Sequence, residues 1–121
     1  MGPLETSVMQ RLWAVEQPQT VREVQEFIAA DRTIAYTTVM TVLDNLHGKG
    51  FVTRERQGRA YVYSPRETRE EYTASLLGNA LADGGDRRGV LMHFVDRLDE
   101  EALASLRQLL QEPGNDPEGV P

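Results

Sequence analysis

Residues 34–63 read IAYTTVMTVLDNLHGKGFVTRERQGRAYVY, and the spacing of their apolar side chains changes partway along. In the first half, four of them recur at the i, i+3, i+4, i+7 spacing of a helix face: Val39, Val42, Leu43 and Leu46. We expect this helix to end at Lys49-Gly50, since glycine commonly follows a helix C-terminus. Residues 51–56 and 59–63 are then rich in Val, Thr and Tyr and flank Gln57-Gly58, which predicts two strands joined by a tight hairpin turn.

Two further helices are predicted before this segment. Residues 4–16 carry apolar side chains at helical spacing. Thr20 and Glu23 have the spacing of a capping box, which predicts a second helix beginning there. Three helices followed by a hairpin are typical of a winged helix-turn-helix domain, and a short strand at residues 18–20 would complete its sheet. We therefore expect a mostly α-helical fold with a small β-hairpin wing, the winged-helix domain covering residues 1–64.

Residues 65–111 predict three more helices but no sheet to cover their apolar faces. The fourth helix is expected at residues 66–82, and the sixth begins after Asp99, a favourable N-cap. Because so short a chain buries little core, we expect this region to be a helical dimerisation region that packs against the same region of a second copy. The residues expected in that interface are Tyr72, Leu76, Leu77, Leu81, Val90, Leu91, Phe94, Val95, Leu98, Leu103, Leu106 and Leu110. Residues 112–121, rich in proline and glycine, are expected to form a disordered tail.

The composition excludes several classes of function. A chain of 121 residues allows one domain, or one small domain with an oligomerisation segment. It holds no cysteine, which excludes disulfides, thiolate metal sites and cysteine nucleophiles. His47 and His93 have no second ligand at metal-binding spacing, and no nucleophile stands with a base, so we expect no metal, no cofactor and no catalytic residue. No apolar run approaches the ~18 residues of a membrane span, and no signal peptide is recognisable, so we expect a cytoplasmic protein without membrane insertion.

The charge is unevenly distributed along the chain. The formal net charge of −6 arises entirely in residues 65–121, because residues 1–64 carry seven basic and seven acidic side chains. Within that neutral half, residues 49–59 have a local excess of positive charge, since only Glu55 opposes the four cations Lys49, Arg54, Arg56 and Arg59. Basic side chains around a hairpin turn can reach the phosphates of DNA. The alternative is a solvated hairpin in which arginine and glutamate pair across the strands.

The helix before the hairpin carries a second group of candidate DNA-binding residues. Away from its apolar stripe lie short hydroxyl and amide side chains with one methionine: Thr37, Thr38, Met40, Thr41 and Asn45. Such side chains let a helix lie deep in the major groove, donate to base edges and meet the methyl group of thymine. Alternatively, Thr37 and Thr38 cap the helix and the rest of this face is solvated. The helix face and the basic wing, in this order, together favour binding to DNA.

Three segments resemble one known family. Residues 35–43 (AYTTVMTVL), 48–54 (GKGFVTR) and 58–65 (GRAYVYSP) are similar to the penicillinase-repressor family of bacterial winged-helix regulators, the BlaI/MecI type. The likeness extends from Leu4 to about Leu110, and its centre looks most like actinobacterial members. The resemblance implies a homodimer that binds a palindromic double-stranded operator and represses transcription, with the C-terminal helices intertwined.

The resemblance also implies roles for single residues. Thr38 and Thr41 match base-reading positions, with Thr37 and Met40 beside them, and Arg59 matches a wing residue. Asn45 stands where some relatives carry arginine, so one phosphate contact of those relatives is missing from this sequence.

The same resemblance implies a route of induction. In staphylococcal-type members a membrane β-lactam sensor triggers cleavage of an Asn-Phe bond in the dimerisation region; here the matching pair is His93-Phe94, which lacks the asparagine. The resemblance implies that the protein regulates β-lactam-response genes. It also implies release of the protein from DNA by proteolysis or by loss of dimerisation, with a membrane sensor or a protease as partner. Copper-responsive relatives use C-terminal cysteines, which this chain lacks. The rival hypothesis is a winged-helix protein-interaction module without specific DNA binding.

Overall fold

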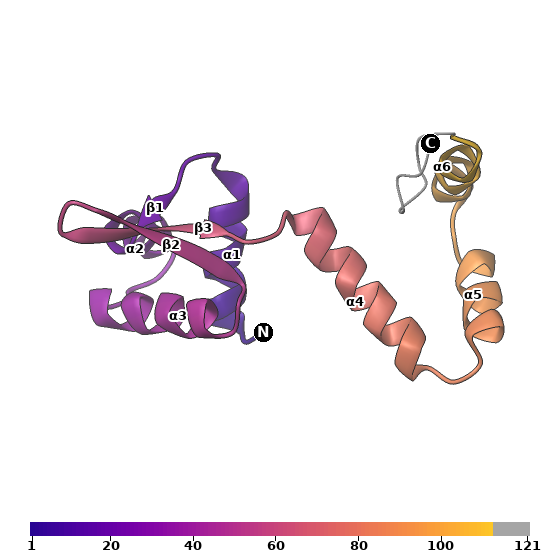
Figure 1. The fold of residues 1–121 in the computed structure, drawn as a ribbon, viewed down its shortest axis with the longest axis horizontal. Helices are drawn as coiled ribbons and strands as arrows, with labels where there is room; N and C mark the ends of the chain where they lie inside the picture. Colours follow the sequence, from indigo (N-terminus) through magenta and orange to yellow (C-terminus); the bar gives the residue numbers. More distant parts are fainter. Residues whose placement is uncertain (113–121) are drawn as a thin grey trace. The chain divides into compact units, whose positions relative to one another are not determined.

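The structure is a computed structural model that describes residues 1–112, so the predicted tail at residues 112–121 lies outside the described residues except for Glu112. The chain forms two compact units, Met1–Ala74 and a second that begins at Ser75. The elements follow in the order α1 (Pro3–Ala14), β1 (Gln19–Thr20), α2 (Val21–Ala29), α3 (Tyr36–Gly48), β2 (Val52–Gln57), β3 (Ala60–Pro65), α4 (Arg69–Asp83), α5 (Arg87–Asp96) and α6 (Glu100–Gln111) (Figure 1). A mostly helical chain with one small antiparallel sheet confirms the predicted fold class.

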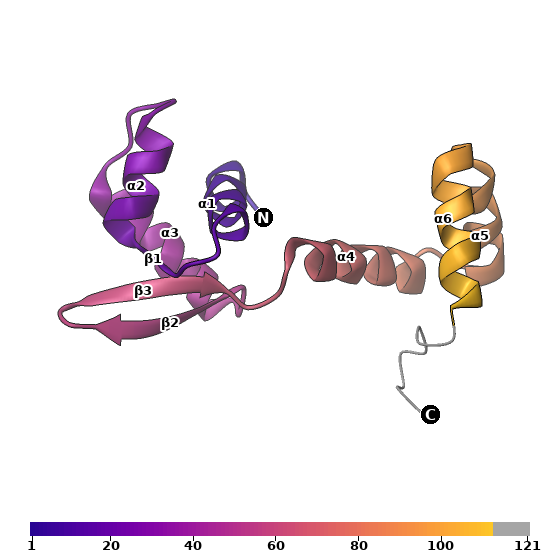
Figure 2. The ribbon, with the colours of Figure 1, turned by 90° about the horizontal axis from the view of Figure 1, so that it is seen from above.

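The sheet has the strand order β1-β3-β2, and both pairings are antiparallel (Figure 2). The predicted strand before α2 is present as the two residues of β1. The hairpin turn was predicted one residue too early: Gln57 pairs with Ala60, so the turn is Gly58-Arg59. Gly58 has φ 62°, and a two-residue hairpin loop that needs a positive φ at its first residue places glycine there. Arg59 is therefore at the tip of the wing rather than in its second strand.

The two ends of α3 are formed differently. At its C-terminus, the amide of Gly50 donates to the carbonyl of His47 and the amide of Phe51 donates to the carbonyl of Leu46, which together make a Schellman motif. Gly50 has φ 83°, the left-handed conformation that this motif requires. At the N-terminus, the N-cap is Ala35, and no side chain caps the helix.

Capping boxes begin two other helices. The predicted box of Thr20 and Glu23 is present at the start of α2, with each side chain bonded to the other residue's backbone amide. The same arrangement joins Thr68 and Glu71. The fourth helix therefore begins at Arg69 and not at residue 66 as predicted, because Thr68 is its N-cap.

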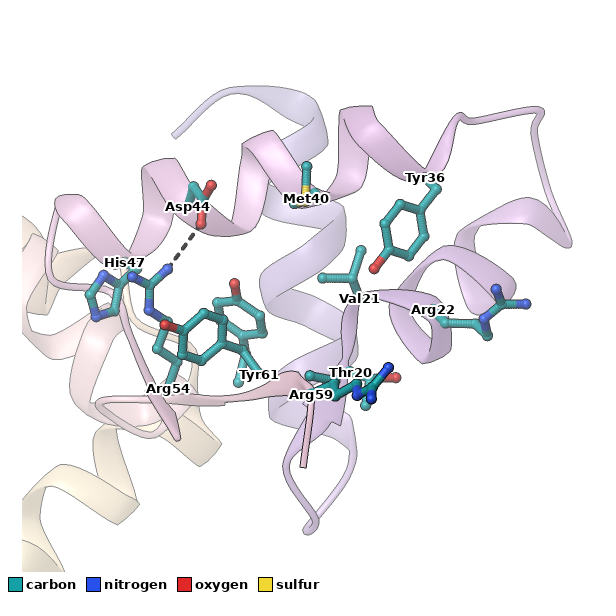
Figure 3. A pocket seen from close by; sticks show the side chains of 12 residues that line it. Thr20, Val21, Arg22, Tyr36, Met40, Asp44, His47, Arg54, Arg59 and Tyr61 are labelled. Atoms are coloured by element: carbon teal, nitrogen blue, oxygen red, sulfur yellow. Dashed lines mark hydrogen bonds and ion pairs between the residues drawn. The ribbon is translucent and has the colours of Figure 1, made fainter. Parts of the chain in front are cut away.

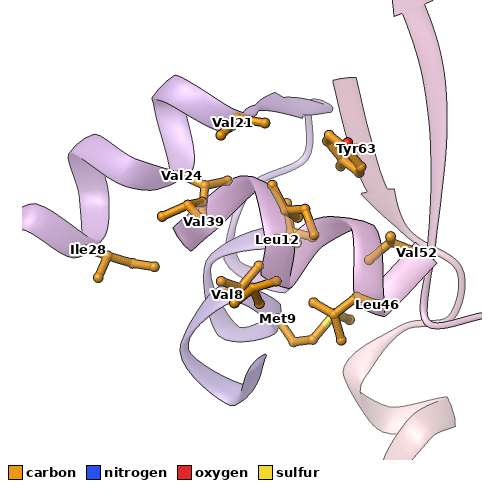
Figure 4. Close-up of a cluster of buried hydrophobic side chains, with 12 residues drawn as sticks. Val8, Met9, Leu12, Val21, Val24, Ile28, Val39, Leu46, Val52 and Tyr63 are labelled. Carbon is orange, nitrogen blue, oxygen red and sulfur yellow. The ribbon is translucent and has the colours of Figure 1, made fainter. Parts of the chain in front are cut away.

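A hydrophobic core joins α1, α2, α3 and the sheet (Figure 4). All four residues of the predicted α3 stripe are buried in it, and Tyr63 enters from β3. The remaining buried members of this cluster are Val8, Met9, Leu12, Val21, Val24, Ile28 and Val52. The core therefore fixes which side of α3 faces inward.

Aromatic contacts carry the first unit past the predicted boundary at residue 64. The ring of Tyr72 lies 5.5 Å from that of Trp13 and 5.7 Å from that of Phe51. The indole Nε1 of Trp13 donates to the carbonyl of Glu67 at 3.0 Å. Tyr72, predicted as a dimer contact, thus packs against the winged-helix core of its own chain.

Helices α4, α5 and α6 are capped at their N-termini, and their apolar side chains are at most half-buried. Asp86 and Asp99 accept hydrogen bonds from the backbone at the starts of α5 and α6, and the latter was the predicted N-cap. Along the described residues of α4, α5 and α6 no side chain is buried within this chain.

We predict that Leu43→Ala destabilises the protein by about 2–5 kcal/mol, because it leaves a cavity where Leu43 is now fully buried. Met40→Ala, on an exposed position of the same helix, is the matched control and should cost less than about 1 kcal/mol. Urea denaturation at one fixed protein concentration measures both. Equal losses in the two variants would contradict the assignment of the core.

A second prediction concerns the ion pair between α1 and the end of α3, in which Lys49 Nζ lies 2.9 Å from Glu5 Oε2. The hydrogen bond from Lys49 lowers the pKa of Glu5 below its ordinary value of 4.5. A lowered folded-state pKa stabilises the protein above pH 4.5, and this contribution is lost as the pH falls through the folded-state pKa. Glu5→Gln should therefore lower the urea midpoint at pH 7 and have no effect at about pH 2.5. A midpoint difference that is the same at both pH values would refute this role.

Candidate nucleic-acid interface

Helix α3 presents three distinct faces. Its core stripe is buried. A second face, with residues at i, i+4, i+8 and i+11, faces the wing and consists of Tyr36, Met40, Asp44 and His47. The third face carries Thr37, Thr38, Thr41 and Asn45, all of them exposed. Met40, predicted beside the base-reading threonines, therefore lies on the wing side of the helix.

The hydroxyl of Thr41 is already engaged within the helix. Its Oγ1 donates to the carbonyl of Thr37 at 2.9 Å, so its hydrogen is not available to a base. What Thr41 offers to a partner is an exposed methyl group and the acceptor capacity of its oxygen. Thr37 and Thr38 stand at the second and third positions of α3, and the N-cap is Ala35, so they do not cap the helix.

A groove of about 830 Å³ separates α3 from the wing (Figure 3). Tyr36 and Met40 line it from the helix, Tyr61 from the wing and Arg22 from α2. Sequence reasoning did not assign Arg22, Tyr36 or Tyr61 to the site. The i, i+4, i+8, i+11 spacing on α3 and the alternation of side chains along β3 could have identified the two tyrosines, but only once the wing was known to face this side of the helix.

Arg54 spans the groove from β2. Its Nη1 lies 3.0 Å from Asp44 Oδ1, and its guanidinium carbon lies 4.4 Å from the centre of the Tyr61 ring (Figure 3). A hydrogen bond to Tyr63, the cross-strand partner of Arg54, raises the pKa of Arg54 above its usual value. Burial raises the pKa of the Tyr63 hydroxyl, and the bond from Arg54 opposes this rise. Arg54 is therefore held on both sides of the groove.

The other predicted cations differ in how far they are neutralised. Lys49 is paired with Glu5, although 55% of its side chain remains exposed. Arg56 and Arg59 are exposed, and neither forms an ion pair with any carboxylate of residues 1–112. Arg56 lies 5.7 Å above the Tyr61 ring, and Arg59 is at the tip of the wing. Of these four cations, the two without a carboxylate partner in residues 1–112 are therefore those nearest the end of the hairpin.

The predicted interface residues of the second unit carry apolar surface that this chain leaves open. Leu76, Leu77, Leu91, Phe94 and Leu110 are exposed. The half-buried members of the predicted set are Leu81, Val90, Val95, Leu98, Leu103 and Leu106. The pair predicted as a cleavage bond, His93 and Phe94, is exposed in the C-terminal half of α5. In residues 1–112, no helix has the length and apolar character needed to span a membrane.

Sequence and structure comparisons agree with this geometry. Residues 1–112 match the family of penicillinase repressors. The transcriptional regulator BlaI of Mycobacterium tuberculosis is 45% identical over 115 residues, which cover 93% of this chain and 83% of that protein. The penicillinase repressor of Bacillus licheniformis is 26% identical over 117 residues, which cover 92% and 89%. These relatives are named as regulators and not as enzymes, in line with the expectation for this chain.

Solved structures place the fold in the same group. The solution structure of the DNA-binding domain of the repressor BlaI matches with a TM-score of 0.53 and 26% identity, over 60% of this chain and 87% of that one. A MarR family protein from Bacillus stearothermophilus matches with a TM-score of 0.50 over 92% and 71%, but at 18% identity this shows likeness of fold alone. The resemblance found in the sequence is thus confirmed: the chain belongs to the penicillinase repressor family of winged-helix regulators.

Proposed function

We propose that this protein is a transcriptional repressor that binds double-stranded operator DNA, with α3 in the major groove and the wing against the sugar-phosphate backbone. The observation that carries the proposal is an exposed face of short polar side chains on α3 beside a wing with two arginines, Arg56 and Arg59, that no carboxylate of residues 1–112 neutralises. The α3 face supplies groups that can read bases, and the two wing arginines supply positive charge for phosphates.

Each residue of the exposed α3 face has a proposed part in recognition. Thr38 and Thr41 face the base edges, and the engaged hydroxyl of Thr41 leaves its methyl group to contact a thymine methyl. Thr37 and Asn45 lie on either side of them on the same face. Met40 lines the edge of the groove, where it can contact the backbone sugars.

The partly neutralised cations have a smaller proposed part. Lys49 reaches a phosphate only by sharing its amine with Glu5 or leaving it. Arg54, also predicted as a DNA ligand, has Nη1 of its guanidinium bonded to Asp44, which offsets its charge.

We further propose that the protein acts as a homodimer through residues 75–111. No apolar side chain of α4, α5 or α6 is fully buried within the described chain, and five of those expected in the interface are exposed, so burying this surface against a second copy would stabilise both. A dimer with two-fold symmetry presents two α3 helices and therefore reads a palindrome. Binding at a promoter would exclude RNA polymerase, in the cytoplasm where the chromosome lies.

Release from DNA is proposed to follow loss of the dimer, by proteolysis or by dissociation. The His93-Phe94 bond lies within the ten-residue helix α5, and proteases bind extended chains, so cleavage there requires α5 to unfold locally. Control of β-lactam-response genes, with a membrane sensor or a protease as partner, is the route that the family resemblance implies for this chain.

The central prediction is tested by selecting random duplex DNA with the purified protein. We expect a palindrome whose half-sites are about one helical turn apart. Arg59→Ala should weaken binding to all sequences alike, because a phosphate contact carries no sequence information. Failure to enrich any sequence at low salt would favour the rival function, a winged-helix module that binds proteins and whose acidic surface repels DNA.

The role of Thr41 allows a sharper test on the selected operator. Thr41→Val keeps the methyl group and should preserve sequence preference, whereas Thr41→Ser keeps the hydroxyl and should relax it at one base pair, by about 1 kcal/mol of discrimination. Competition binding against operators changed at single positions measures the preference. The opposite order of the two variants would show that the hydroxyl, not the methyl group, reads the base.

Dimerisation is tested by Leu77→Glu, which places a charge among the exposed apolar side chains of α4. Sedimentation should give twice the chain mass of 13.6 kDa for the parent protein and the single mass for the variant, with operator binding lost in parallel. Asn79→Glu, two residues along the same helix, is the matched control and should remain dimeric. A variant at Leu77 that stays dimeric would place the interface elsewhere.

A further inference from the structure

One acidic side chain stands on the DNA-facing side of the first unit in a position that DNA binding alone does not explain. Asp44 is exposed on α3, at the edge of the groove between this helix and the wing. A carboxylate so placed repels phosphates, and its presence lowers the affinity of any DNA-binding surface. Its contact with Arg54 accounts for it.

The geometry around Arg54 differs from that of a phosphate ligand. The side chain is held by the Asp44 carboxylate on one side and by the face of Tyr61 on the other, and Tyr63 shares the same face of the sheet. Only 29% of the Arg54 side chain is exposed. Its Nη1 is bonded to Asp44, whose negative charge offsets that of the guanidinium and repels an approaching phosphate. Arg56, two residues along the same strand, is exposed and has no carboxylate partner in residues 1–112.

Resting on the proposed function, we propose that Asp44, Arg54 and Tyr61 form a brace that fixes the wing to the recognition helix, so that Arg54 and Asp44 are positioning residues and not DNA ligands. An exposed ion pair by itself stabilises little. Here the planar guanidinium also stacks on an aromatic ring, a combination that lysine cannot reproduce. By holding the tip of the wing at a set distance from α3 before DNA arrives, the brace reduces the ordering that binding would otherwise require.

The brace assigns the phosphate contacts of this side to other residues. Arg59 at the wing tip and Arg56 near it have no carboxylate partner in the described chain, and Arg22 lines the groove from α2. The salt dependence of binding should therefore come from these arginines. Arg54 contributes to affinity without contributing to the release of counterions.

The test measures binding of the selected operator by the full chain over a series of salt concentrations. Asp44→Asn and Arg54→Gln should each weaken binding about threefold to tenfold, and the double variant should be no weaker than either, because both changes remove the same contact. Arg54→Lys should fail to restore binding. In a plot of log affinity against log salt, Arg54→Gln should leave the slope unchanged, whereas Arg59→Gln should reduce it by about 0.9 for each phosphate that the side chain no longer neutralises.

The sign of the Asp44 effect separates the brace from simple repulsion. If Asp44 only repels DNA, Asp44→Asn should strengthen binding. Glu55→Gln is the matched control: Glu55 follows Arg54 on β2 but lies on the other face of the strand, so this change removes one negative charge without touching the brace and should strengthen binding. Tighter binding by Asp44→Asn, or a slope reduced by Arg54→Gln and restored by Arg54→Lys, would overturn the proposal.

A second readout needs no DNA. Hydrogen exchange of the wing amides at residues 56–61 should be faster in Asp44→Asn and Arg54→Gln than in the parent protein, and unchanged in Glu55→Gln. If the parent protein selects no DNA but this difference is present, the proposed function fails while the brace stands. If the parent binds its operator and the wing amides exchange alike in all variants, the brace is refuted and the proposed function stands.

Discussion

Burial of one stripe of α3 is the constraint on which the other features of the first unit depend. Val39, Val42, Leu43 and Leu46 enter the core formed with α1, α2 and the sheet, and this fixes the rotation of the helix about its axis. Once it is fixed, the remaining positions fall onto two other faces, one open and one opposite the wing. The polar side chains proposed to read DNA are exposed because the apolar stripe on the other side of α3 is buried. A rotation of α3 that exposed part of the stripe would bury some of these polar side chains.

The charged side chains are distributed unevenly, so the net charge of −6 does not describe the surface of either half of the chain. The acidic excess belongs to the C-terminal half, and even in the basic segment the charges are not equivalent. Two of the four cations there are paired, Lys49 with α1 and Arg54 with α3, and each pair joins elements of the fold. The four cations form one cluster in the sequence, but in the structure two of them link elements of the first unit and the other two face solvent.

Local rules accounted for most of the elements, because their causes lie within a few residues. The capping box of Thr20 and Glu23, the N-cap Asp99 and the glycine after α3 all act over one helical turn, and each is found as predicted. The differences from the prediction are local as well: the turn lies one residue later, since Gly58 takes its first position, and α4 starts at Arg69, since Thr68 and Glu71 form a capping box there.

The sequence by itself determined the winged-helix class, the apolar stripe of α3 and the family, since all of these follow from short-range periodicity and from motifs of adjacent residues. Only the tertiary structure decided that Asp44 meets Arg54, that Met40 faces the wing and that Tyr72 packs on Trp13. These contacts join side chains on different elements, and they depend on how the core orients each element, which periodicity along a single element does not specify.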